Sequence, residues 1–236
     1  DAAEYGGQAV NLSTGRYPDG APTFRELITP TPGTTNSPWS AHEIVINEIM
    51  YHPISENDED EYVELYNRGT NDLDVSYWRL EGAMDYTFPT NLTIPRGGYL
   101  VIAKSHTNLL AKYVNLNSGN LIGDYQRTLS NRRDRLRLLR PDLEGLLPGN
   151  PTLITNQPYI LVSEVEYGSG GRWGLWADGG GSSLELVDPR GDPRLAANWR
   201  DSDEGQKTTN WTTIEYTGRL DLGNATYAAD SLQIGR

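Results

Sequence analysis

The fold is decided by two short runs, Ile44-Val45-Ile46-Asn47-Glu48-Ile49-Met50-Tyr51 and Glu61-Tyr62-Val63-Glu64-Leu65-Tyr66-Asn67, which an acidic loop joins. In the second run the apolar Val63 and Leu65 alternate with polar and aromatic residues. Successive side chains of a strand point to opposite faces, so Val63 and Leu65 share one face. This face can close a core, while the other meets solvent or a partner.

The same alternation recurs along the chain, whereas sustained helical periodicity is nearly absent. Strands are expected at residues 44–50, 61–67, 77–81, 86–88, 99–103, 133–139, 160–167 and 183–187, with turn clusters between them. One short helix is expected at 108–113, inside a long polar connection that runs from residue 104 to residue 126. Short strands at this spacing predict an all-β fold, an antiparallel sandwich.

Composition excludes several classes of function. The 236 residues include 20 Lys+Arg and 32 Asp+Glu, a net charge of -12, which argues against binding to nucleic acid or to an anionic membrane. The chain has no Cys, so disulfides, thiol nucleophiles and Cys-ligated zinc are excluded. No stretch approaches the roughly 18 apolar residues of a membrane helix. Histidine metal motifs, a nucleophile elbow and a phosphate loop are also absent, so no enzyme is expected.

Further motifs follow the first two runs in a definite order. They are Tyr77-Trp78-Arg79-Leu80, Phe88-Pro89, Ile94-Pro95-Arg96-Gly97-Gly98-Tyr99-Leu100-Val101-Ile102-Ala103, Leu129-Ser130-Asn131, Asp134-Arg135-Leu136-Arg137-Leu138 and Val165-Glu166-Tyr167-Gly168. Together, over about residues 41–190, they resemble a lamin tail domain of the bacterial, secreted kind. The resemblance implies an immunoglobulin-like β-sandwich at the cell surface or outside the cell, and it points away from catalysis.

The sandwich is expected at 41–190, with a flanking strand segment on each side. Residues 1–40 contain Gly15-Arg16-Tyr17-Pro18-Asp19-Gly20, which resembles the end of such a domain. We interpret 1–40 as the terminal segment of a preceding module or as a strand donated to a neighbour, and 191–236 as a C-terminal strand extension or the start of a further module. The connections 106–126 and 143–157 are unusually long and are expected to hold what is particular to this protein.

The acidic run at 56–61 is the best candidate for a metal site. Asp58, Asp60 and Glu61 supply hard oxygen ligands in a loop between two strands, and Ca²⁺ takes about six to eight oxygens. Asp201 and Asp203 form a second, weaker candidate. Calcium is the one cofactor that the sequence suggests. We favour the alternative of a solvated, charged turn that keeps the sheet edge soluble.

A basic strip stands out on this acidic chain, and its candidate interface residues are Arg132, Arg133, Arg135 and Arg137. Arginine pairs with carboxylates in two-pronged geometry. The strip could therefore contact the acidic 56–61 loop of a neighbour, which predicts a homo-oligomer or contacts between adjacent modules. In the alternative, the arginines line the solvent face of a strand, because leucines alternate with them.

Four tryptophans, Trp173, Trp176, Trp199 and Trp211, are candidates for stacking on sugar rings. Flat aromatic rings pack well on sugar faces, which would make glycans a partner. In the alternative interpretation they close the core at the rim of the sandwich.

Three functions remain open. The leading hypothesis is a non-enzymatic structural module of an exported surface or filament-forming protein, in which residues 1–40 contact a neighbour by strand addition. The second is a carbohydrate-binding or adhesion module, with calcium as an optional ligand. The third is an accessory domain of a larger exported hydrolase.

Overall fold

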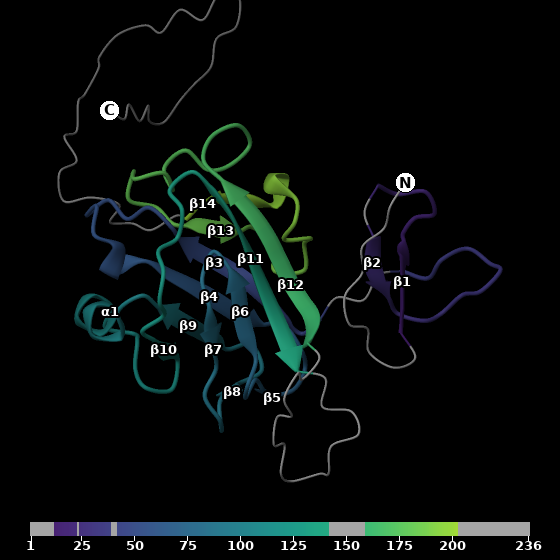
Figure 1. The fold of residues 1–236 in the computed structure, drawn as a ribbon, viewed down its shortest axis with the longest axis horizontal. Coiled ribbons are helices and arrows are strands. Elements are labelled where there is room, and N and C mark those ends of the chain that lie inside the picture. The colour runs from purple at the N-terminus through teal and green to yellow at the C-terminus, as the bar shows by residue number, and fades with distance from the viewer. Residues whose placement is uncertain (1–11, 23, 39–41, 142–158, 203–236) are drawn as a thin grey trace, which may run out of the picture.

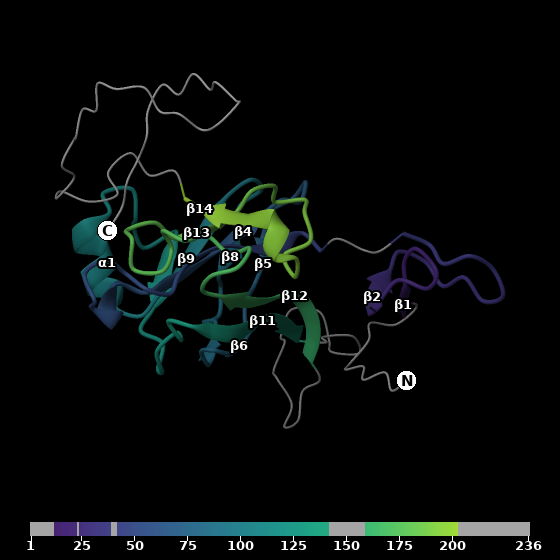
Figure 2. The same cartoon turned by 90° about the horizontal axis from the view of Figure 1, so that it is seen from above.

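The computed structural model describes residues 12–22, 24–38, 42–141 and 159–202, and most of them form a β-sandwich of two layers (Figures 1 and 2). One layer is a six-stranded sheet in the order β10 (Leu121–Gly123), β9 (Tyr99–Ala103), β4 (Tyr62–Asn67), β3 (Ile44–Met50), β13 (Leu184–Leu186) and β14 (Trp199–Asp201). The other is a four-stranded sheet in the order β12 (Tyr159–Gly168), β11 (Arg133–Pro141), β6 (Arg79–Gly82) and β7 (Tyr86–Thr87). The predicted all-β sandwich is confirmed.

The core lies between the two layers. β3 and β4 contribute Ile46, Ile49, Val63 and Leu65, all fully buried, and the opposite sheet contributes Leu136 with its neighbours on β11 and β12. The predicted faces of β4 are confirmed, because Val63 and Leu65 both point into this core. Alternation thus indicates which face of β4 is buried, and burial of apolar side chains such as these is the dominant favourable contribution to folding.

β12 closes the sandwich along one edge of β3. In the described structure β3 pairs with β13 only through Glu48 and Ile49. Beyond this short pairing, β12 crosses to β3, and the Ser163 hydroxyl accepts a hydrogen bond from the buried amide of Ile46 at 3.2 Å. This bond satisfies a backbone donor that a half-paired strand would otherwise bury at a cost.

The connection 106–126 covers part of the outer face of the six-stranded sheet. It forms α1 (His106–Lys112) and then β10, which pairs in parallel with β9. Leu109 of α1 is fully buried in a second, smaller core with Met50, Tyr62 and Leu121. The predicted helix is therefore confirmed, but the Tyr62 end of the outer face is covered by α1 and does not meet solvent.

All of the predicted strands are present, with bounds that differ by at most two residues. The sequence pattern did not indicate β10 and β14, nor β5 (Leu73–Asp74) and β8 (Thr93–Ile94), which pair with each other. These strands have two or three residues, too few for an alternating pattern to be recognised. The predicted connection 143–157 and residues 203–236 of the predicted C-terminal extension lie outside the described residues.

Before the sandwich, β1 (Ser13–Arg16) and β2 (Phe24–Leu27) form an antiparallel hairpin of their own, which lies beside the sandwich on the side away from α1 (Figure 1). Within the described residues these strands pair with each other and with no strand of the sandwich. Strand addition to a neighbour stays a prediction. No helix in the described part of the chain has the length and apolar character to cross a membrane.

Candidate functional site

The carboxylates of the acidic run at 56–61 contact different partners. Asp58–Asp60 form a short 3-10 helix, η1, and the buried Asp60 accepts hydrogen bonds from Ser55 and Asn108 and forms an ion pair with Lys112. Burial opposes ionisation of Asp60, but the hydrogen bonds from Lys112, Ser55 and Asn108 outweigh it and hold its pKa below the usual value. Asp60 thus fastens α1 to the sandwich.

Glu61 turns into the core instead. It is fully buried, and its Oε2 accepts hydrogen bonds from the Tyr125 hydroxyl and from the Leu129 amide, both at 3.0 Å. Burial raises its pKa to about 7, although these two hydrogen bonds act in the opposite direction. Glu61 and Asp60 are therefore engaged by groups of the protein itself.

The second acidic candidate is only partly described. Asp201 Oδ1 accepts a hydrogen bond from the Ala177 amide at 2.8 Å, and Asp203 lies outside the described residues. Across the ranges that the structure covers, no three His, Asp or Glu side chains are grouped so that they could hold a metal ion. The calcium site stays a prediction.

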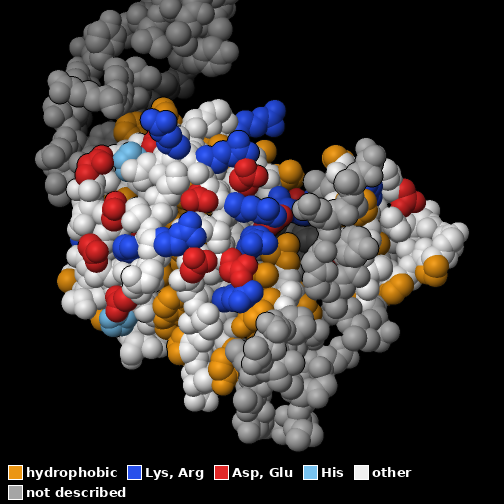
Figure 3. Space-filling view, viewed as in Figure 1, with side chains coloured by type: hydrophobic (Ala, Val, Ile, Leu, Met, Phe, Trp, Pro, Cys, Tyr) orange, Lys and Arg blue, Asp and Glu red, His pale blue; other side chains and the backbone are white. Residues whose placement is uncertain are grey.

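Three of the four arginines of β11 are paired within their own sheet. Arg135 Nε donates to Glu164 on β12 at 3.0 Å, Arg137 reaches Glu81 on β6 at 3.2 Å, and Arg133 pairs with Glu166. Figure 3 shows basic and acidic side chains interleaved on the face of the molecule that β11 and β12 form. Arg132 forms no ion pair with any described residue. The arginines line the solvent face of β11, as in the alternative interpretation, and the predicted contact with a neighbour stays a prediction.

The three candidate tryptophans that the structure describes do not form an exposed platform. Trp199 is 2% exposed, its Nε1 donates to the Pro193 carbonyl at 2.7 Å, and its ring centroid lies 6.4 Å from that of Trp173. This corrects its assignment to a sugar-stacking surface, because a buried ring has no free face. Trp173 packs against the core and Trp176 is half-buried, while Trp211 lies outside the described residues.

A junction that sequence reasoning missed joins the hairpin to the sandwich. Asp192, which is 8% exposed, forms an ion pair with Arg25 of β2 through Oδ2 and with Arg194 through Oδ1 at 3.2 Å. Arg194 also donates to the Phe24 carbonyl at 3.1 Å. Two arginines from segments far apart in the sequence therefore converge on one carboxylate.

A second contact lies beside the junction. His42 Nε2 is 3.5 Å from Glu26 Oε1, so a residue two positions before β3 contacts β2. Burial, assisted by the nearby charge of Arg140, lowers the pKa of His42 to about 4. His42 is therefore neutral near pH 7, and its ring makes a polar contact with the Glu26 carboxyl group without forming an ion pair.

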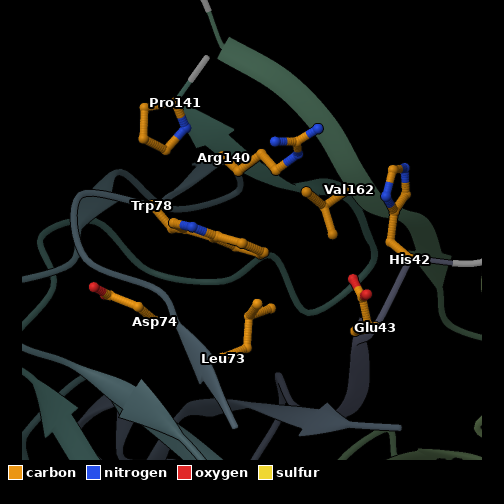
Figure 4. A pocket seen from close by; sticks show the side chains of 8 residues that line it. All are labelled: His42, Glu43, Leu73, Asp74, Trp78, Arg140, Pro141 and Val162. Carbon is orange, nitrogen blue, oxygen red and sulfur yellow. The ribbon is translucent and has the colours of Figure 1, made fainter. Parts of the chain in front are cut away.

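A cavity of about 370 Å³ lies near this contact, where the end of β11 approaches β5 and the start of β3 (Figure 4). It is lined by His42, Glu43, Leu73, Asp74, Trp78, Arg140, Pro141 and Val162. Neither the junction nor the cavity had a signal in the sequence. Their residues belong to unrelated segments, and Trp78 stood out there only as part of a strand motif.

The fold and these surfaces define an immunoglobulin-like β-sandwich with a docked N-terminal hairpin. The lamin tail domain family model matches residues 38–199, and the chain belongs to that family. No curated protein matches the sequence. Four chains of solved structures match, among them a DUF4876 family protein from Bacteroides thetaiotaomicron VPI-5482. That protein is 12% identical, with 76% of this chain and 75% of that chain covered and a TM-score of 0.43.

Proposed function

We propose that this chain is a non-enzymatic structural module of an exported or cell-surface protein, and that the hairpin β1–β2 is a joint between the sandwich and the segment before it. The observation that carries the proposal is the carboxylate of Asp192, which Arg25 and Arg194 share. Membership of the lamin tail domain family supports a β domain without catalytic activity. The exported location is supported by the resemblance of the sequence to lamin tail domains of the bacterial, secreted kind.

The hairpin can be ordered only through its contacts with the sandwich. Each of its strands has four residues, and an isolated two-stranded hairpin is marginally stable in water. The ion pair between Arg25 and Asp192 is largely shielded, since the two side chains are 14% and 9% exposed. A shielded, hydrogen-bonded pair is less weakened by water and salt than a surface pair. The junction can therefore hold the hairpin in one position, as a joint between modules requires.

The variant Asp192→Asn tests the joint, because it removes the charge and keeps the shape. We expect faster amide hydrogen exchange in residues 13–27 and unchanged exchange in β3, since the hairpin loses its anchor while the core stays intact. The matched control is Asp188→Asn in the same loop, whose carboxylate accepts a hydrogen bond from the Arg190 amide. An asparagine can keep that local bond.

Arg25→Gln should reproduce the effect from the hairpin side, where it leaves the pair between Arg194 and Asp192 untouched. Equal exchange in wild type, Asp192→Asn and Arg25→Gln would contradict the joint. The exported location has a separate test, which is fractionation of the source cells. Recovery of the chain in the medium or at the cell surface is expected, and recovery in the cytosol alone would contradict it.

A further inference from the structure

The cavity beside His42 contains two opposite charges that do not pair. The Arg140 guanidinium and the Glu43 carboxylate both line it, yet neither side chain forms an ion pair or hydrogen bond with any described residue. At longer range the charge of Arg140 acts on His42 and Glu26. Arginine offers only donors and a carboxylate only acceptors, so the cavity presents both kinds of group to a ligand.

The remaining wall is largely apolar. Trp78, Leu73, Val162 and Pro141 line the space between the polar groups. Figure 4 shows the Trp78 indole nearly edge-on, with Leu73 on one side and Arg140 on the other. Ligand pockets in proteins combine such apolar walls with a few polar groups, in volumes of about 300–1,000 Å³. The volume of about 370 Å³ lies at the small end of this range.

The charged groups that line the cavity indicate which class of ligand it can bind. Glu43 and Asp74 are acidic, Arg140 is basic, and His42 is neutral near pH 7. An anionic ligand would meet two carboxylates, and a cationic ligand would meet Arg140. A neutral ligand with many hydroxyl groups avoids both penalties, because each hydroxyl can donate to a carboxylate and accept from the guanidinium.

We propose that this cavity binds a short, neutral saccharide. The hydroxyl groups of the sugar bridge Glu43 and Arg140, and its C–H face packs on the apolar wall beside Trp78. This activity is separate from the joint at Asp192. It also places sugar binding away from Trp173, Trp176 and Trp199, the residues that the sequence suggested.

The test is an array of neutral oligosaccharides built from glucose, galactose, mannose and N-acetylglucosamine, with uronate- and sialate-containing glycans and a lysine-rich peptide beside them. The best neutral glycan is then titrated into wild type and variants by calorimetry. Arg140→Gln and Glu43→Gln should each weaken its binding about tenfold or more, because each removes a hydrogen bond to a charged group. The matched control is Arg132→Gln, an exposed arginine outside the cavity, which should leave the affinity unchanged.

Melting temperatures close to that of wild type establish that the two cavity variants fold. Binding to neutral glycans that both variants weaken supports the proposal. Binding that neither variant changes would overturn it by placing the sugar elsewhere, such as near Trp176. Preference for acidic glycans or for the peptide, or no binding at all, would also overturn it.

Discussion

Burial changes the acid–base chemistry of Glu61. Its ordinary pKa is 4.5, and in the folded chain burial raises it to about 7. Leu129 and Tyr125 donate hydrogen bonds to Oε2, the charge of Asp58 raises the pKa further, and that of Lys104 lowers it. In the described structure the buried Oε1 has no hydrogen-bond partner. The protonated form therefore persists up to about pH 7, because it carries no charge into the core.

The variant Glu61→Gln should remove a pH-dependent part of the stability. Between pH 4.5 and about 7 the folded chain binds more protons at Glu61 than the unfolded chain does. The stabilisation is thus complete below pH 4.5 and is lost as the pH rises to about 7. We expect the free energy of unfolding of wild type minus that of the variant to fall by about 2 kcal/mol from about pH 5 to about pH 8, measured by urea unfolding.

His42 affects the pH dependence of stability in the opposite direction, and this contribution cancels when wild type is compared with Glu61→Gln. Its pKa is lowered from 6.5 to about 4, so the unfolded chain binds the extra proton and stability rises with pH over this range. Wild type and Glu61→Gln share His42, which therefore cancels in the difference. A difference that stays constant with pH would show that Glu61 is ionised in the fold as it is in the unfolded chain.

At the scale of elements, α1 depends on one carboxylate of the acidic loop. Asp60 accepts a hydrogen bond from Asn108 and pairs with Lys112, both on α1, whereas the exposed Asp58 contacts Thr128 at 3.4 Å. The helix has only seven residues, and a helix this short is not stable by itself. Contacts to Asp60 and to the small core around Leu109 must therefore hold it in place.

Asp60→Asn and Asp58→Asn form a matched pair in this loop. We expect Asp60→Asn to lower the free energy of unfolding by about 1–3 kcal/mol, because it leaves Lys112 without its charged partner. Amide exchange in residues 106–112 should become faster. Asp58→Asn should change neither quantity appreciably. A calcium-dependent rise in melting temperature that both variants abolish would instead establish the metal site predicted from the acidic run.

At the scale of the whole molecule, charge is balanced across the outer face of the four-stranded sheet. Three of the four arginines of β11, namely Arg133, Arg135 and Arg137, each pair with a glutamate of β12 or β6. A basic strip in the sequence therefore becomes a mixed surface in the fold (Figure 3). Such a surface attracts an acidic partner less than unpaired arginines would.

The double variant Arg133→Gln, Arg135→Gln tests whether this face joins subunits. We expect the sedimentation coefficient to equal that of wild type, and the free energy of unfolding to change by less than about 1 kcal/mol, because exposed ion pairs contribute little. Sedimentation velocity at low and high salt measures the first quantity, and urea unfolding measures the second. A shift to a smaller species would establish the predicted contact between subunits.

The sequence by itself determined the sandwich. Alternation in residues 61–67 places Val63 and Leu65 on one buried face, and the apolar runs in residues 44–50 and 99–103 mark strands that are buried almost throughout. It also indicated the short helix within the connection 106–126. It could not show that α1 and β10 cover the outer face, because that depends on Leu109 meeting Tyr62 and Met50 from distant segments.

Only the tertiary structure decided where the functional groups lie. The acidic run looks uniform in sequence, yet the fold leaves Asp58 exposed, pairs Asp60 with Lys112 and buries Glu61. Arg25 and Asp192 are 167 positions apart, so no local sequence pattern could predict their ion pair. The periodicity of a strand indicates which of its faces is buried. The partner of a charged side chain depends on which distant segments the fold brings together, and no local sequence pattern encodes that.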